Sequence, residues 1–258
     1  RTPSGPTPPT SGMRRAVPEA TVRMGERISR PSAERWPALA PCWARGGWKG
    51  ARRPWQADSG GTPLNASSIR RKFAVDRFAR LEQLVAAEVM DLYFQYAKSY
   101  ARMPKYYELE TETASLGRYA DAMGEVLLAK LLPEVEDCVG KRLHATYSFL
   151  RFYTPESRLR RHTDRTSCEY TLTLTVGSEG TRAPWPIMIE TQKGVQAFDL
   201  APGDGLLFSG RELPHWRECL PVGTWLQLFL HYVDADGPHA ANRFDGRKFL
   251  GPTRRSVA

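Results

Sequence analysis

The feature that most constrains the fold of this chain is a series of short strand patterns in its second half. Six segments rich in aromatic and β-branched residues are separated by Gly, Pro and Asp. They are Thr146–Tyr153, Glu169–Val176, Pro186–Glu190, Val195–Leu200, Gly205–Phe208 and Trp225–Val233. In the second segment, threonines alternate with Leu and Val, which is the period of a strand with two different faces. No helical pattern separates the segments, so the sequence predicts an antiparallel sandwich or barrel rather than a parallel sheet with crossover helices.

Helical patterns precede the strands. Apolar residues over Ile69–Tyr93 recur three and four positions apart, which predicts an amphipathic helix that continues towards Ala101 and ends before Pro104. A second helical region is predicted over Ala114–Val139, and Pro133 should divide it into two shorter helices. We interpret these helices as a layer that supports the strand core.

The first 65 residues differ in composition from the rest of the chain. They hold 10 of the 20 prolines, 8 of the 21 glycines and 11 of the 37 Lys and Arg residues, but only 4 of the 28 Asp and Glu residues. This composition is typical of a disordered basic tail or of a segment that directs import into an organelle. Most of the net charge of +9 therefore lies in residues 1–65, and we do not expect the nearly neutral domain over residues 66–258 to bind nucleic acid.

The four cysteines are widely spaced and form no CxxC pair, which argues against a disulfide framework and against a metal knuckle. We expect reduced thiols in an intracellular, cytoplasmic protein, unless residues 1–65 direct organellar import. The chain has no run of about 18 apolar residues, so no membrane-spanning helix and no membrane partner are predicted.

A His-x-Asp motif carries the clearest chemical signal. His162 and Asp164 lie directly before the strand in which Thr and Leu alternate, and His215 follows at the start of another predicted strand. One intervening residue lets the first two side chains converge on a metal ion. A second histidine from a neighbouring strand then completes two nitrogens and one oxygen, the ligand set of non-haem Fe(II) oxygenases.

Three stretches of the chain resemble a known family. They are YSFLRFYTPESRLRRHTDRTSCEYTLTLTV, APGDGLLFSGRELPHWRE and WLQLFLHYV. In this order and spacing they are similar to the jelly-roll core of the Fe(II)/2-oxoglutarate-dependent dioxygenases, particularly the prolyl 4-hydroxylase-like branch. The resemblance implies an α+β fold, in which a double-stranded β-helix core is supported by N-terminal helices. Within residues 66–258 it places helical support at 67–140, the jelly-roll core at 141–235 and a C-terminal extension at 236–258.

The resemblance also implies an activity. His162, Asp164 and His215 match the family's iron ligands, and Tyr153 matches a position near the co-substrate. The implied reaction uses Fe(II), O₂ and 2-oxoglutarate, and it hydroxylates an amino acid, a peptidyl side chain or a small metabolite with release of succinate and CO₂. Asp164 supports hydroxylation, because halogenating relatives carry a small residue at this position.

One feature departs from the family pattern. The family usually places a Lys or Arg some ten residues after the second histidine, where it binds the distal carboxylate of 2-oxoglutarate, but no Lys or Arg occurs between Arg217 and Arg243. Arg217, His231 and Arg151 are the candidate replacements, and we favour Arg217. Two alternatives stay open: an iron oxygenase or metal-dependent isomerase that does not use 2-oxoglutarate, and a non-catalytic module that binds RNA or a protein through its basic tail.

Overall fold

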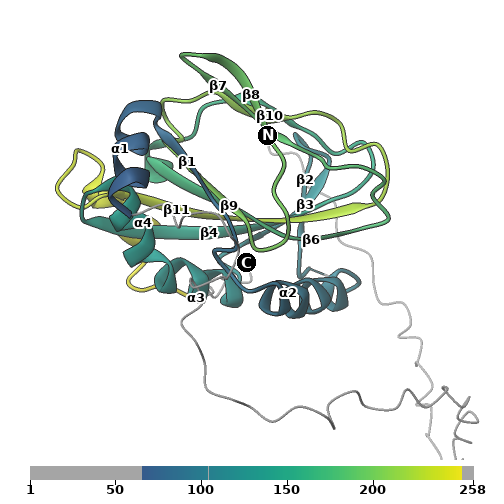
Figure 1. Cartoon of the computed structure of the whole chain (residues 1–258). Coiled ribbons are helices and arrows are strands. Elements are labelled where there is room, and N and C mark those ends of the chain that lie inside the picture. The colour runs from purple at the N-terminus through teal and green to yellow at the C-terminus, as the bar shows by residue number, and fades with distance from the viewer. Residues whose placement is uncertain (1–65, 104, 252–258) are drawn as a thin grey trace, which may run out of the picture. The chain divides into compact units, whose positions relative to one another are not determined.

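Two antiparallel sheets face each other in the structure, a computed structural model that describes residues 66–103 and 105–251 (Figure 1). The larger sheet has seven strands in the order β1-β9-β6-β11-β4-β3-β2, and the smaller has four in the order β5-β10-β7-β8. The strands of the larger sheet are β1 Phe78–Leu81, β2 Glu108–Glu110, β3 Ser115–Tyr119, β4 Leu143–Tyr153, β6 Tyr170–Glu179, β9 Gly205–Phe208 and β11 Thr224–Asp234. Those of the smaller sheet are β5 Leu159–His162, β7 Ile187–Thr191, β8 Gly194–Phe198 and β10 His215–Arg217. This is the jelly-roll core that the sequence predicts.

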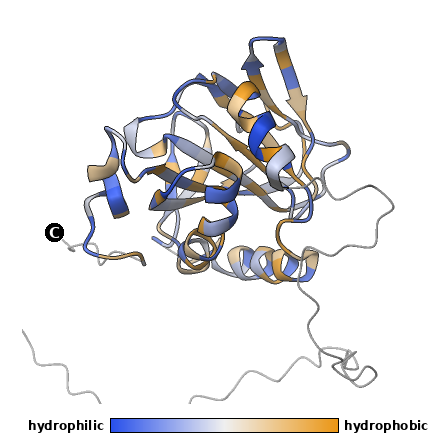
Figure 2. Ribbon diagram, turned by 60° about the vertical axis from the view of Figure 1, so that its left-hand side comes forward, coloured by the Kyte–Doolittle hydropathy of each residue, from blue (hydrophilic) through white to orange (hydrophobic). Residues whose placement is uncertain are grey.

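Helices lie against the outer face and one end of the larger sheet (Figure 1). They are α1 Ala66–Asp76, α2 Ala87–Tyr100, α3 Ala122–Lys130 and α4 Leu132–Val139. Hydrophobic and hydrophilic residues alternate along α2, at the bottom of the molecule (Figure 2). Its buried side chains pack into one hydrophobic cluster with those of α3, α4 and the central strands β6 and β11. The predicted supporting layer is therefore present on this face.

The central strand β6 has two chemically different faces, as the alternation of its residues predicts. Leu172 and Leu174 belong to the hydrophobic cluster beneath the helices. The hydroxyls of Thr171 and Thr175 lie on the other side and bond to polar groups of the sheet and of the loop before it. The larger sheet thus uses one face for stability and the other for a polar interior.

The prediction of one long helix over residues 69–101 is wrong, because this stretch forms helix α1, strand β1 and helix α2. The chain leaves α1 at Arg77, whose φ of 64° is not helical, and β1 then pairs with β9 before α2 begins. Phe78 and Leu81, three positions apart, fit a helical period, but both are buried at 5% and 8% exposure in the strand. Pairing with the edge of the sheet therefore prevails over local helical preference.

The second predicted helical region is correct only in its later part. Ser115–Tyr119 forms strand β3, which pairs with β4. The expected break is confirmed: α3 ends at Lys130, and Pro133 lies in the first turn of α4, where a missing N–H costs nothing. The six predicted strands are also confirmed. The strand expected to start at His215 is β10, His215–Arg217. The sequence patterns miss β2 and β5, which have only three and four residues.

The C-terminal extension begins after β11 and contains a short 3₁₀ segment, η2 Ala240–Gly246, which packs against β4. The predicted tail over residues 1–65 and the last residues, 252–258, lie outside the described residues. In the part of the chain that the structure describes, no helix has the length and apolar character needed to cross a membrane.

Candidate metal centre

Two histidines meet where β5 and β10 pair. His162 is the last residue of β5 and His215 the first of β10, and they are direct partners in the antiparallel register. Their ring centroids are 4.3 Å apart. The two imidazoles, 53 residues apart in the sequence, therefore reach one point inside the fold.

Both imidazoles present the same nitrogen to this point. Nδ1 of His162 donates to the carbonyl of Arg160 at 2.8 Å, and Nδ1 of His215 donates to the carbonyl of Leu213 at 3.0 Å. A carbonyl can only accept, so Nδ1 carries the proton in each ring and Nε2 keeps a free lone pair. This is the tautomer that binds a metal through Nε2.

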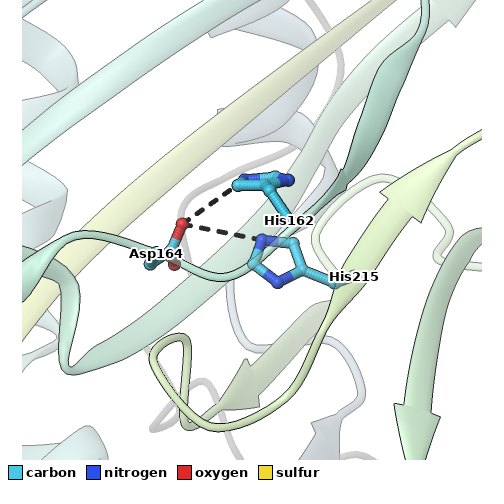
Figure 3. Close-up of side chains that lie close together, drawn as sticks. All are labelled: His162, Asp164 and His215. Carbon is cyan, nitrogen blue, oxygen red and sulfur yellow. Dashed lines mark ion pairs between the residues drawn. The ribbon is translucent and has the colours of Figure 1, made fainter.

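Asp164 completes the group (Figure 3). Its Oδ1 lies 3.6 Å from Nε2 of His162 and 3.6 Å from Nε2 of His215. These separations are too long for hydrogen bonds. They suit an ion about 2.1 Å from each donor atom, which holds two ligands between about 3 and 4 Å apart. The other oxygen, Oδ2, accepts a hydrogen bond from Thr171 at 2.7 Å.

The backbone also fixes the position of Asp164. Its N–H donates to the carbonyl of Gly210 at 2.8 Å, and the N–H of Gly210 donates to the carbonyl of Glu169 at 3.1 Å. A Cβ atom on Gly210 would lie only 2.2 Å from Oδ2 of Asp164. Glycine is required at position 210 because the carboxylate occupies the space of a side chain.

The charges around the three side chains favour a cation. Burial lowers the pKa of His215, so this imidazole stays neutral. The contact with the Asp164 carboxylate raises the pKa of His162. Burial alone would raise the pKa of Asp164, but its interactions with His162, His215 and His231 outweigh burial and lower it, so the carboxylate is ionised. One negative charge and two imidazole lone pairs thus face a common point.

Arg217 lies two residues beyond His215 and is fully buried, with 2% exposure. Its Nη1 donates to the carbonyl of Trp185 and its Nη2 to the side chain of Gln227 at 3.2 Å. Both acceptors are neutral, and Nε has no acceptor within the described residues. Burial lowers the pKa of Arg217 to about 10, so the guanidinium still carries its charge at neutral pH.

The other candidate co-substrate residues fall into two groups. Tyr153 is grouped with Arg217, because both contact Trp185. Tyr153 is completely buried, and its hydroxyl has no partner within the described residues. Arg151 stacks over Tyr153 and is partly neutralised by Glu110 at 4.0 Å.

His231 lies instead beside the metal group. Its Nδ1 is 3.1 Å from the hydroxyl of Thr171, the same hydroxyl that donates to Asp164. Burial lowers the pKa of His231 to about 4, so its ring is neutral at physiological pH. A neutral imidazole bonded in this way is poorly suited to bind a distal carboxylate.

Three residues near these sites carry roles that the motif does not reveal. Thr171 holds Asp164, Gln227 accepts from Arg217, and Trp185 contacts both Tyr153 and Arg217. The alternation of threonines in β6 was the available signal for Thr171, because it showed that one face of this strand is polar. A depression of the surface is lined by Arg158, Leu159, Arg160, Arg161, Trp216, Arg217 and Glu218.

Comparisons with known proteins place this fold. No protein-family model matches the chain, and no curated protein is similar to it in sequence. Solved structures do match. A prolyl-4-hydroxylase from Pseudomonas putida superposes with a TM-score of 0.54 at 13% identity, over 66% of this chain and 99% of that one. An oxidoreductase of the 2OG-Fe(II) oxygenase family from Burkholderia pseudomallei superposes with 0.52 at 14%, over 67% and 92%.

A third similar structure is the epimerase SnoN in complex with Fe³⁺, α-ketoglutarate and nogalamycin RO, with a TM-score of 0.57 at 11% identity, over 74% of this chain and 93% of that one. At such identities the likeness concerns the fold. The chain has the jelly-roll fold of the Fe(II)/2-oxoglutarate-dependent oxygenases, a prolyl-4-hydroxylase among them.

Proposed function

We propose that the protein is an Fe(II)- and 2-oxoglutarate-dependent oxygenase that hydroxylates an amino acid, a peptidyl side chain or a small metabolite. The observation that carries this proposal is the convergence of two imidazole Nε2 atoms, both in the ligating tautomer, on one oxygen of Asp164. Similarity of fold alone would not assign an activity.

The donor set fits Fe(II). Two imidazoles and one carboxylate form a ligand set without thiolate and leave coordination positions open for small molecules. His162, Asp164 and His215 would hold the metal. When bound, the iron supplies the redox chemistry by which O₂ and 2-oxoglutarate give succinate, CO₂ and an oxidised substrate. The protein contributes the fixed tautomers, a carboxylate oriented by Thr171, and a buried surrounding on the side of His215.

Arg217 fits the distal carboxylate of 2-oxoglutarate. A buried cation with neutral partners is costly unless an anion joins it, and the free Nε of Arg217 and free hydroxyl of Tyr153 are two donors without acceptors in the described residues. A carboxylate would satisfy both. We therefore propose that the guanidinium reaches this subsite from β10, which explains why no Lys or Arg is needed on β11.

The choice of hydroxylation rests on Asp164, which fills the coordination position that would otherwise be free for a halide. The free thiols of Cys138, Cys168 and Cys219 support a reducing, intracellular location.

An anaerobic titration tests the proposal. Fe(II) and then 2-oxoglutarate are added to the protein while the metal-to-ligand charge-transfer absorption of the chelate is followed. We expect a band with the wild type and none with His162→Ala, because this variant lacks a ligand. Iron binding without a band would reject the use of 2-oxoglutarate and favour an iron oxygenase or isomerase that does not need it.

Two arginine variants assign the carboxylate partner. In Arg217→Met, the concentration of 2-oxoglutarate that gives half of the maximal charge-transfer absorption should rise by at least about 30-fold. The reason is that losing one member of a buried charge pair costs roughly 2 kcal/mol or more. Arg151→Met is the matched variant and should change this concentration by much less. The opposite ranking would place the carboxylate at Arg151.

A further inference from the structure

A second group of reactive side chains lies against the metal centre. The sulfur of Cys168, a ring nitrogen of His231 and a carboxylate oxygen of Asp164 are all within 4.8 Å of one another. Cys168 comes from the short 3₁₀ segment η1, Thr166–Cys168, which follows the His-x-Asp motif directly. A buried thiol therefore lies beside a proposed iron ligand.

Tyr147 of β4 is the partner of this thiol. Its hydroxyl is 3.2 Å from Sγ of Cys168, and both residues are buried, with 8% and 2% exposure. The ring of Tyr147 is held from several sides: it stacks on Tyr119 at 5.1 Å and contacts His231 at 4.5 Å. The sulfur and the phenol are thus fixed against each other.

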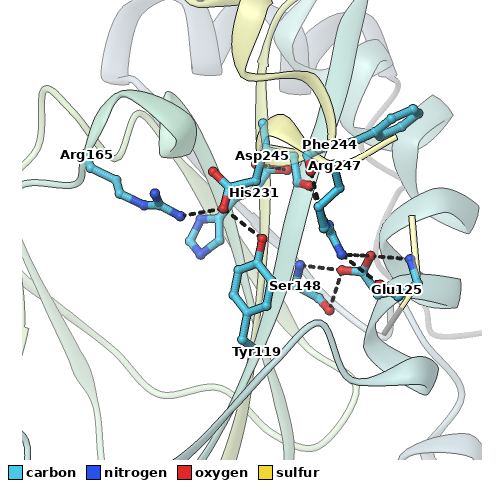
Figure 4. Close-up of polar contacts among 10 residues, drawn as sticks. Tyr119, Glu125, Ser148, Arg165, His231, Phe244, Asp245 and Arg247 are labelled. Carbon is cyan, nitrogen blue, oxygen red and sulfur yellow. Dashed lines mark hydrogen bonds and ion pairs between the residues drawn. The ribbon is translucent and has the colours of Figure 1, made fainter. Parts of the chain in front are cut away.

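The C-terminal segment bonds to two residues around this pair: Figure 4 shows Asp245 with Arg165 and Tyr119. The guanidinium of Arg165 lies 4.7 Å from the ring of Tyr147 and bonds to Asp245 of η2 at 2.9 Å. Asp245 also accepts from Tyr119, the ring that stacks on Tyr147, at 2.7 Å. The phenol is therefore enclosed by residues from three separate parts of the chain.

The metal site does not need the thiol as a ligand. Thr171 already bonds to both Asp164 and His231, so the polar atoms next to the sulfur have partners without it. Burial raises the pKa of Cys168 to about 12, and burial likewise raises the pKa of Tyr147. Both groups are neutral, and their oxidation must remove hydrogen rather than start from a thiolate.

We propose that Cys168 and Tyr147 become joined by a thioether bond between Sγ and the ring carbon next to the phenol hydroxyl, in an O₂-dependent reaction at the metal centre. This inference rests on the proposed function, which supplies the oxidant. The S–H and one ring C–H bond break and a C–S bond forms, so the pair gives up two electrons and two protons. One O₂ and one 2-oxoglutarate are consumed, and succinate, CO₂ and one water are the other products.

Such a bond would act on the site itself. Cys168 lies four residues after Asp164, and its N–H already bonds to the carbonyl of Arg165 in the same loop. Tying this loop covalently to β4 would restrict the motion of the carboxylate that binds iron. The modification would therefore be a maturation step that stabilises the metal centre.

Peptide mass spectrometry tests the proposal directly, without an assay of substrate turnover. Tyr147 and Cys168 fall on different tryptic peptides, Leu143–Arg151 and Thr166–Arg182. Purified protein is loaded with Fe(II) and 2-oxoglutarate, exposed to O₂, then reduced, denatured, alkylated and digested. We expect one species that joins the two peptides, resists thiol reductants and lacks two hydrogen atoms relative to their sum. Cys138 in the same sample should be fully alkylated.

Three variants give the comparison. Cys168→Ser and Tyr147→Phe should each yield separate peptides, and His162→Ala should do the same although both partners are present. If the wild type forms the charge-transfer band and consumes O₂ but its peptides stay separate, or if Cys168 gains only oxygen, the crosslink is refuted while the proposed function stands. If no band forms, the proposed function itself fails. A crosslink in His162→Ala would refute the role of the metal.

Discussion

Thr171 decides which oxygen Asp164 offers to a metal ion. Its hydroxyl has one hydrogen, which it donates to Oδ2 of Asp164, and it then accepts from Nδ1 of His231. Only Oδ1 is left facing the two histidines. A single bound oxygen keeps more coordination positions open than a carboxylate that binds through both.

Replacing Thr171 by Val removes this hydroxyl and keeps the shape. We expect Fe(II) or Mn(II) affinity to fall by about 10–100-fold, the usual effect of losing such an outer hydrogen bond. Isothermal titration with Mn(II) measures it. Thr175→Val is the matched control on the same face of the same strand, because its hydroxyl bonds to Gln227 and not to Asp164. Equal losses in the two variants would mean that the effect is one of general packing.

Gly210 gives a second test at the scale of one residue. A methyl group there would lie 2.2 Å from Oδ2 of Asp164 and 2.7 Å from the carbonyl of Cys168, so Gly210→Ala must displace the carboxylate. We expect metal affinity to fall by at least about 100-fold, at the upper end for disturbed ligand orientation. Ser209→Ala next to it removes a buried hydroxyl without a partner in the described residues and should leave metal affinity unchanged. Normal binding by Gly210→Ala would show that Asp164 is not a ligand.

The sequence predicted that His162, Asp164 and His215 lie together, because two of them are close in the sequence and the third begins a strand, and the structure brings these candidate ligands together. The environment of Arg217 could not be predicted. A sequence pattern of three residues, the length of β10, does not reveal which side chain faces inward. In the sequence alone, Arg217 could equally be an exposed residue that pairs with Glu218 or a buried residue. Its burial depends on Trp185 and Gln227, which come from distant parts of the chain.

At the scale of elements, the central strands of the larger sheet follow from the sequence, and its edge strands β1 and β2 do not. β6 and β11 are long, with ten and eleven residues, and β6 also alternates Thr with Leu and Val. β1 has four residues with a spacing that also fits a helix, and only its pairing with β9 makes it a strand. Long-range pairing of this kind leaves no local trace in the sequence.

The C-terminal segment is an element whose contribution depends on pH. Burial alone would raise the pKa of Asp245, but hydrogen bonds from Tyr119, Ser167 and Arg165 outweigh burial and lower it. A depressed carboxyl pKa stabilises the folded state above the unfolded value of about 3.9, and this stabilisation is lost as the pH falls through the folded pKa.

Asp245→Asn should therefore lower the free energy of unfolding at pH 7, and the difference from the wild type should shrink below about pH 4. Urea unfolding at a series of pH values measures it. Asp236→Asn is the control, because Asp236 pairs with Arg142 on the surface, where both side chains are more than two-thirds exposed. A difference between Asp245→Asn and wild type that stays constant with pH would show that the carboxylate charge is not what holds the segment.

At the scale of the whole molecule, the two sheets have different roles. The larger sheet buries its outer face under the helices and carries most of the hydrophobic core. The candidate site is built from its inner face, from the smaller sheet and from the loop after β5 that carries Asp164. The two candidate ligand histidines come from the smaller sheet, and Thr171, which bonds to Asp164, comes from the larger one. The candidate site therefore depends on how the two sheets face each other.

The distribution of charge separates the metal centre from any binding of nucleic acid. Residues 1–65 hold 11 basic and 4 acidic side chains, whereas all residues of the proposed metal and 2-oxoglutarate site lie between residues 153 and 217. We expect a chain of residues 66–258 to bind Fe(II) and 2-oxoglutarate as the full chain does. Any affinity of the full chain for RNA should fall steeply with salt, because it arises from phosphate neutralisation, and should disappear on this deletion.

Fluorescence anisotropy with a labelled RNA at several salt concentrations, run beside the charge-transfer titration, checks both halves of this expectation. Loss of the iron and 2-oxoglutarate band in residues 66–258 would mean that the tail takes part in the site. RNA binding that survives the deletion would instead assign it to the domain. The exposed Arg158 and Arg160, at the start of β5, would then be the first residues to replace, since they line a depression of the surface.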